Sequence, residues 1–133
     1  MRVRTSSWSL EPIAGWTIGK DPVCVNLTRG PAGGALQVNS TGENPRPVTL
    51  AALRDVTSRI SAGRSALTEV DFGAFKGYSI SYVEGDSYCR QFLLASDNIV
   101  VFAAYNGPPQ ARASEEPEVE AMLRTLRREA PAA

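Results

Sequence analysis

The N-terminal part of the chain alternates polar and apolar residues in short runs. This alternation predicts a first strand over residues 3–10, a second over residues 23–28 and a third over residues 35–41. The segment 30–34 is rich in glycine, but it lacks both the Gly-Lys-Ser/Thr ending and the Gly-x-Gly-x-x-Gly spacing of a phosphate-binding loop. We therefore interpret it as a turn and expect the three strands to form a meander.

Apolar residues next recur at spacings of three and four, which is the pattern of an amphipathic helix. The apolar stripe consists of Leu50, Leu53, Val56 and Ile60. Thr49 is suited to cap the N-terminus of this helix, and Gly63 is suited to end it.

The second half of the chain carries the strongest strand pattern, with strands expected over residues 67–72, 75–84, 88–95 and 99–105. The last of these is almost wholly apolar, which is typical of a central strand covered on both faces. A second helix is expected from Ser114, with Pro117 in its first turn and Arg124, Arg127 and Arg128 towards its end. Its apolar stripe consists of Val119, Met122, Leu123 and Leu126.

The order of these elements is three strands, a helix, four strands and a helix. No repeat and no interdomain linker interrupts it, so residues 1–133 are expected to form a single domain. The pattern predicts an α+β fold in which two helices pack on a largely antiparallel sheet of about six to seven strands.

Composition excludes several kinds of site. The chain has no His, which rules out His-based catalytic triads, general bases and metal ligands. Its 14 basic and 14 acidic residues balance, and no basic patch of the kind that binds nucleic acid stands out. Glu115, Glu116, Glu118 and Glu120 lie where the second helix would begin. They are explained either by the helix dipole or by attraction to a basic partner.

Two cysteines, Cys24 and Cys89, are too few for a zinc site in a chain without His. The first ten residues lack the apolar run of a signal peptide, and no stretch approaches the length of a membrane span. We therefore expect a cytoplasmic protein with reduced, mostly buried thiols, no membrane span and no cofactor.

The candidate partner-binding residues cluster around one predicted hairpin: Tyr82, Glu84, Asp86, Tyr88 and Arg90. The tyrosines, together with Tyr78 and Tyr105, form either a recognition surface or a core face with hydroxyls at its rim. Arg90 binds a carboxylate or phosphate of a partner, or it pairs with Glu69, Glu84 or Asp86 within the sheet. Glu84 and Asp86 either meet a basic partner or form a solvated turn. Glu69 and Asp71 lie on the same face of one predicted strand. Such paired carboxylates can serve as an acid–base pair, but more often they are exposed charges on a strand.

Four segments carry a resemblance to a known layout: Trp16; Gly34-Ala35-Leu36-Gln37-Val38; Tyr88-Cys89-Arg90-Gln91-Phe92-x-Leu94 followed by Val100-Val101-Phe102-x-x-Tyr105-Asn106; and Glu118-x-x-x-Met122-Leu123-x-x-Leu126-Arg127. Together they resemble the Mog1/PsbP-like domains, which include DcrB-like secretion chaperones, and small bacterial proteins linked to toxin immunity. The chain departs from that pattern at Cys89, where an aromatic residue is expected.

This resemblance implies a non-catalytic domain that binds another protein, most specifically an immunity protein that neutralises a bacterial toxin. One alternative is a DcrB-like chaperone that holds an apolar helix of a secreted effector and forms a homodimer. A further alternative is an enzyme or small-molecule-binding protein, which would need a pocket around Arg90 or Asp71.

Overall fold

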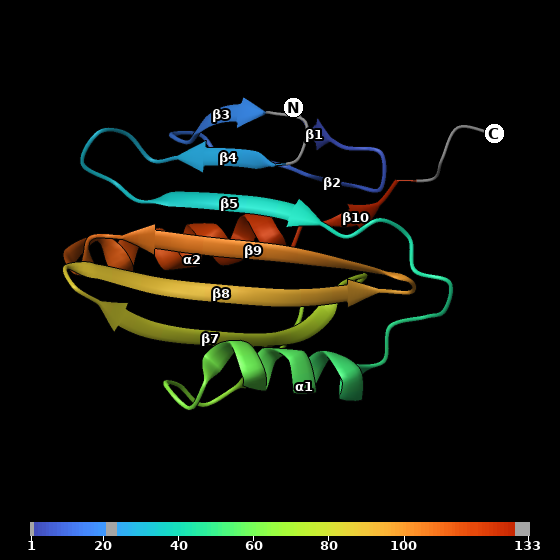
Figure 1. Ribbon diagram of the computed structural model, residues 1–133. Coiled ribbons are helices and arrows are strands. Elements are labelled where there is room, and N and C mark those ends of the chain that lie inside the picture. The colour runs from blue at the N-terminus through green and yellow to red at the C-terminus, as the bar shows by residue number, and fades with distance from the viewer. Residues whose placement is uncertain (1, 21–23, 130–133) are drawn as a thin grey trace.

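A seven-stranded antiparallel sheet forms the centre of this α+β fold (Figure 1). The structure is a computed structural model and describes residues 2–20 and 24–129. The strand order in the sheet is β3-β4-β5-β9-β8-β7-β6. The strands are β3 (Thr17–Lys20), β4 (Val25–Thr28), β5 (Ala35–Ser40), β6 (Thr68–Asp71), β7 (Lys76–Glu84), β8 (Ser87–Ser96) and β9 (Ile99–Gly107). The apolar strand β9 lies in the middle of this order, which confirms its predicted central place. The predicted cover on both of its faces is wrong, because Phe102 and Ala104 are only half-buried and Asn106 is exposed.

The predicted first strand is wrong, because a turn divides it. The hydroxyl oxygen of Thr5 accepts hydrogen bonds from the backbone N–H groups of Ser7 and Trp8, at 3.3 and 3.1 Å, and folds the chain back. This leaves two short strands, β1 (Val3–Arg4) and β2 (Trp8–Leu10), in a second sheet of order β1-β2-β10. The third member, β10 (Arg127–Arg128), pairs with β2, so these arginines are not the end of a helix as predicted.

The predicted meander exists, but with different members. β3, β4 and β5 pair consecutively, and β3 takes the place given to residues 3–10. The turn before β5 closes with a 3.0 Å hydrogen bond from the Arg29 N–H to the Gly34 carbonyl. The predicted second strand begins at residue 23, which lies outside the described residues.

The first helix, α1 (Leu50–Ser61), has the predicted cap but only part of the predicted buried face. Thr49 accepts a 3.1 Å hydrogen bond from the Ala52 N–H. The chain then leaves the helix through Ala62 and Gly63, both with positive φ.

Only Leu53 of the predicted stripe is fully buried, whereas Leu50, Val56 and Ile60 remain 37–40% exposed. The helix instead buries the small residues Thr57 and Ser61. Their hydroxyls donate to the carbonyls of Leu53 and Ser65, at 2.7 and 2.8 Å, which satisfies both polar groups. The apolar stripe is therefore rotated partly off the sheet.

The second helix, α2 (Arg112–Leu123), follows a short 3-10 turn, η1 (Pro109–Ala111). It begins two residues before Ser114, so Pro117 lies inside the helix and not in its first turn as predicted. The predicted apolar residues are buried: Val119, Met122, Leu123 and, just past the helix, Leu126.

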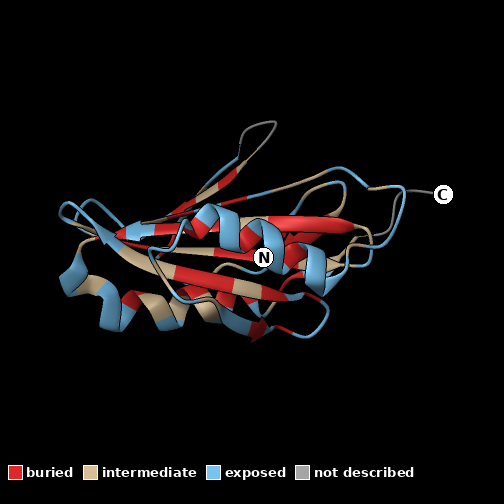
Figure 2. Cartoon of the chain, turned by 60° about the horizontal axis from the view of Figure 1, so that its bottom comes forward, coloured by how far each residue is buried: buried red, intermediate tan, exposed pale blue. Residues whose placement is uncertain are grey.

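The two helices lie on opposite faces of the large sheet (Figure 1). α2 and the small sheet enclose the main core, which includes Trp8, Leu36, Phe92 and Tyr105. α1 covers β7 and β8 over a smaller cluster centred on Leu53, Leu93 and Val100. Both helices turn exposed faces outward (Figure 2). Within residues 2–20 and 24–129, neither helix is long and apolar enough to cross a membrane.

Candidate functional site

The five residues predicted to bind a partner do not share one surface. Side chains two apart on a strand lie on the same face, and register pairs lie on the same face of neighbouring strands. Tyr88 and Arg90 therefore lie on the α2 side of the sheet, and Tyr82, which pairs with Cys89, lies on the α1 side. Glu84 and Asp86 lie at the exposed β7–β8 turn.

Arg90 is held beneath α2, and its side chain is only 13% exposed. Its guanidinium lies 3.3 Å from a Glu116 oxygen and 3.2 Å from a Glu120 oxygen. It also donates to the Ser79 hydroxyl at 3.2 Å. The predicted pairing with Glu69, Glu84 or Asp86 is thus wrong, because the partners come from the helix above the sheet.

Tyr88 belongs to the same network. Its hydroxyl donates a 2.5 Å hydrogen bond to Glu116, and the guanidinium of Arg112 lies 4.3 Å from the centre of its ring. Burial, followed by the contact with Glu116, raises the pKa of Tyr88. Burial alone would raise the pKa of Glu116, but the Tyr88 hydroxyl and the charges of Arg90 and Arg112 outweigh it and lower that pKa.

The acids of α2 therefore have specific partners in the sheet, beyond any effect of the helix dipole. Glu118 lies 3.1 Å from the Arg29 guanidinium. Glu115 is buried and accepts hydrogen bonds from the Tyr105 hydroxyl and the Gly34 N–H, at 2.6 and 2.8 Å. These contacts hold α2 on the sheet. The acidic side chains that make them are already paired within the protein.

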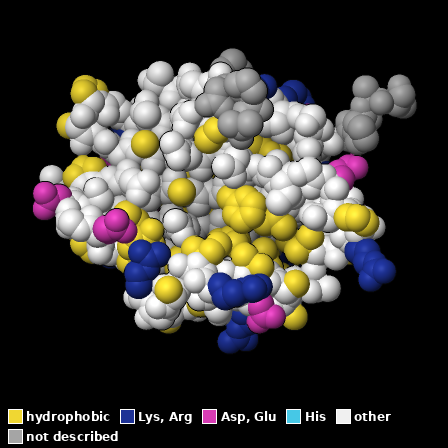
Figure 3. Space-filling view, viewed as in Figure 1, with side chains coloured by type: hydrophobic (Ala, Val, Ile, Leu, Met, Phe, Trp, Pro, Cys, Tyr) yellow, Lys and Arg dark blue, Asp and Glu magenta, His cyan; other side chains and the backbone are white. Residues whose placement is uncertain are grey.

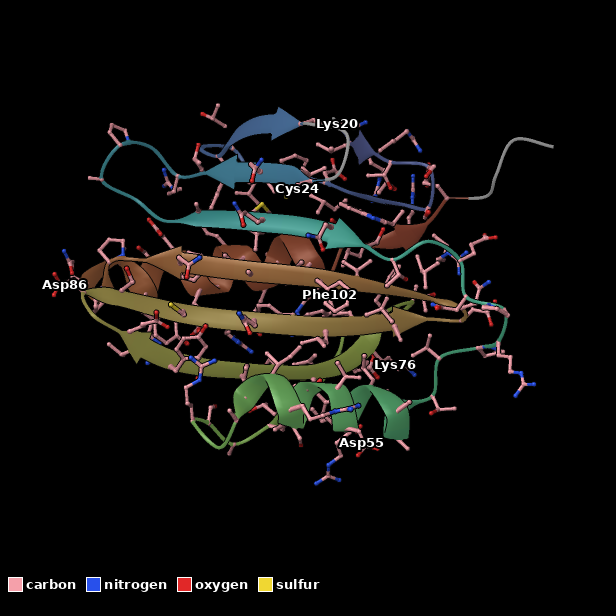
Figure 4. All side chains as sticks on the ribbon, viewed as in Figure 1. Lys20, Cys24, Asp55, Lys76, Asp86 and Phe102 are labelled. Atoms are coloured by element: carbon pink, nitrogen blue, oxygen red, sulfur yellow. The ribbon has the colours of Figure 1, made fainter. Side chains whose placement is uncertain are left out.

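Tyr82, Glu84 and Asp86 lie at one corner of the molecule. Arg64, just after α1, places its guanidinium 4.1 Å from the centre of the Tyr82 ring and 3.6 Å from a Glu84 oxygen. Glu84 and Asp86 are exposed, and Tyr82 is half-buried. Figure 4 shows Asp86 at the tip of the β7–β8 turn. This corner remains open to a partner.

Part of the sheet face that carries α1 is not covered by the helix. The register aligns its side chains in rows across β3, β4, β5 and β9. They are Thr17, Gly19, Asn26, Thr28, Ala35, Gln37, Asn39, Phe102, Ala104 and Asn106, and we call them the open face. All are exposed or half-buried, and none of these described residues is charged.

A groove of about 180 Å³ runs between α1 and the open face. Its apolar lining includes Ile60, Leu93 and Phe102, and Gln37, Asn39 and Gln91 supply amides beside it. Figure 3 shows hydrophobic side chains gathered between α1 and the sheet, bordered by basic side chains on the side of α1. Figure 4 places Phe102 on β9 within this region.

Sequence reasoning missed this surface. Alternation shows which residues share a strand face, but it does not show how far a helix covers that face. One signal was present, because amides alternate with buried apolar residues in the segment 36–39. That pattern is typical of a sheet face that remains in contact with solvent.

The predicted carboxylate pair on β6 is exposed. Asp71 lies 3.7 Å from the Lys76 ammonium and accepts a 2.9 Å hydrogen bond from the Gly73 N–H. Both interactions stabilise the turn between β6 and β7. Among the described residues, no three His, Cys, Asp or Glu side chains gather in a group that could hold a metal ion.

Comparison with known proteins supports the fold alone. No protein-family model matches the chain, and no curated protein matches it. It is similar to the crystal structure of a protein from Bacteroides thetaiotaomicron VPI-5482 at 1.50 Å resolution, with a TM-score of 0.67 and 14% sequence identity. The match covers 92% of this chain and 45% of the other, so this chain corresponds to less than half of that protein's length.

Proposed function

We propose that this chain is a non-catalytic, cytoplasmic protein-binding domain and, most specifically, an immunity protein that neutralises a bacterial toxin by direct binding. The observation that carries the proposal is the open face with its apolar groove. The centres of protein–protein interfaces are depleted in charge and contain apolar or aromatic anchors. An uncharged sheet face that includes Phe102 and lies next to Ile60 has that composition.

The acidic corner has a second role in this proposal. Tyr82 and Glu84 lie on the same side of the sheet as the open face, at the end of the β7–β8 hairpin. Charged groups at the rim of an interface increase the association rate and select partners of opposite charge. Tyr82, Glu84 and Asp86 therefore form the rim, whereas Tyr88 and Arg90 support it from beneath α2.

Capture of the partner tests the proposal. The tagged chain would be used to capture proteins from a lysate of its own bacterium, together with the variants Ile60→Glu and Val83→Glu. Ile60 lines the groove, whereas Val83 is 67% exposed on the opposite face of the sheet. We expect one stoichiometric partner that binds the parent and Val83→Glu and is lost with Ile60→Glu. Equal capture by all three folded proteins would contradict the use of this face.

Growth then decides whether the partner is a toxin. The captured protein would be expressed alone and together with each form of the chain. If the chain is an immunity protein, growth is restored when the partner is expressed together with the parent chain or with Val83→Glu, but not with Ile60→Glu. If expression of the partner alone leaves growth unchanged, the partner is not a toxin. The proposed immunity function is then wrong, although the binding result still holds.

The groove also favours a second candidate, a DcrB-like chaperone for a secreted effector. Its apolar residues Ile60, Leu93 and Phe102 lie beside a helix, where an apolar helix of a cargo could bind. A chaperone would affect secretion of the partner and not growth, and it is expected to be a dimer. This candidate would be excluded if the chain is a monomer in solution and if secretion of the partner is unchanged when the chain is deleted.

A further inference from the structure

A second, larger cleft lies at another edge of the molecule, away from the groove beside α1. It has a volume of about 440 Å³, within the range of small-molecule sites. Its walls come from the β1–β2 turn, the end of β3, the beginning of β4 and the end of β5. Neither this cleft nor the groove is lined by Arg90 or Asp71, where the alternative of an enzyme or small-molecule-binding protein needs a pocket.

Two hydroxyls of residues that line this cleft accept hydrogen bonds from other parts of the protein. The Ser40 hydroxyl oxygen accepts a 2.9 Å hydrogen bond from the indole N–H of Trp8. The Thr41 hydroxyl oxygen accepts a 3.1 Å hydrogen bond from the Val100 N–H. Each hydroxyl keeps its own proton to donate, and the half-buried Ser7 adds another hydroxyl to the wall.

Lys20 supplies positive charge to the same cleft. Its ammonium donates a 2.6 Å hydrogen bond to the Arg4 carbonyl, a neutral acceptor, and so keeps its charge and its remaining N–H donors. Figure 4 shows Lys20 at the end of β3, close to Cys24 before β4. Among the described residues that line the cleft, Lys20 is the single charged one.

We propose that this cleft binds a small anion through its carboxylate or phosphate oxygens. An ammonium together with hydroxyl donors is suited to such oxygens, because hydrogen bonds between charged groups and oxyanions are stronger than neutral ones. The site is independent of the open face, so a partner protein and this ligand bind different parts of the molecule.

The chain has two lysines, Lys20 and Lys76, which makes a direct test possible in the unmodified protein. With ¹³C-labelled lysine, their side-chain signals can be followed by NMR, and the variant Lys76→Gln assigns them. The probes are inorganic phosphate and citrate, each added at constant ionic strength against sodium chloride. Lys76 lies beside Asp71 on the β6–β7 hairpin and serves as an internal control for general charge effects.

We expect a saturable shift of the Lys20 signals with phosphate, citrate or both, while the Lys76 signals stay in place. A response to phosphate alone identifies a phosphate-bearing ligand, and a response to citrate alone identifies a carboxylate. Lys20→Gln should bind at least about tenfold more weakly, as expected for the loss of one hydrogen bond to a charged group. Equal shifts of both lysines, or no shift of Lys20, would overturn the proposal.

Discussion

The hydroxyl of Tyr105 on β9 donates a 2.6 Å hydrogen bond to the carboxylate of Glu115 on α2, and both side chains are buried. The same carboxylate oxygen accepts the Gly34 N–H at 2.8 Å. A side chain at position 34 would place its Cβ 2.8 Å from that oxygen and 2.7 Å from the Tyr105 ring. Gly34 therefore allows α2 to dock, and the glycine-rich turn before β5 provides an amide for an acid of the protein itself.

Removing the Tyr105 hydroxyl should destabilise the fold. In Tyr105→Phe the buried Glu115 carboxylate loses one of its two hydrogen-bond donors, which is expected to lower the free energy of unfolding by about 1–3 kcal/mol. Urea unfolding would measure the difference. Tyr82→Phe is the matched control, because its half-buried ring keeps the contact with Arg64. Equal losses in both variants would show that the buried hydrogen bond contributes nothing specific.

Glu116 should make stability depend on pH in the acid range. The folded protein holds the pKa of Glu116 below its ordinary value of 4.5, so its ionised form stabilises the fold. This contribution is complete above pH 4.5 and is lost as the pH falls further, towards the folded-state pKa. Glu116→Gln should therefore be less stable than the parent at pH 7, with the difference shrinking in acid. Chemical denaturation at several pH values would measure this, and a difference that stays constant with pH would refute it.

Gly77 leaves no room for a side chain between the backbone of β8 and Leu53 of α1. A Cβ at this position would lie 1.9 Å from the Leu93 carbonyl oxygen and 2.8 Å from the Leu53 side chain. Because backbone is in the way, Gly77→Ala should cost roughly 3 kcal/mol or more. Gly19→Ala is the control, since its Cβ would meet nothing within 4 Å, and its effect should stay within about 1 kcal/mol. Thermal unfolding of both variants tests the contrast.

The two cysteines should differ in reactivity. Cys24 is half-buried and Cys89 is buried, and no disulfide joins these two described residues. Burial, followed by the carboxylate of Glu84, raises the pKa of Cys89, which disfavours the reactive thiolate. A thiol reagent at mildly alkaline pH should modify Cys24 first and Cys89 only slowly, with both reacting quickly in urea. Mass spectrometry of digested samples would identify the modified site. Faster labelling of Cys89 in the folded protein would contradict its burial.

Local sequence patterns were sufficient where the structure depends on neighbours along the chain. The alternation of Tyr78, Ile80 and Tyr82 with serines predicted β7, since a period of two directly reflects the pleat. The apolar run from Ile99 predicted β9 as a central strand. The Thr49 cap was predictable because its hydrogen bond spans only three residues. In contrast, the pairing of β10 with β2 depends on a contact between the two ends of the chain.

The sequence by itself determined the α+β class, the helix at residue 50, the central β9 and the absence of any histidine chemistry. Only the tertiary structure decided which faces are covered. It packed Leu53 of α1 against Gly77, left Ile60 beside an uncharged sheet face that includes Phe102, and paired Arg90 with the acids of α2. The reason is physical: periodicity fixes the side of an element on which a residue lies, whereas coverage depends on where distant segments can pack closely.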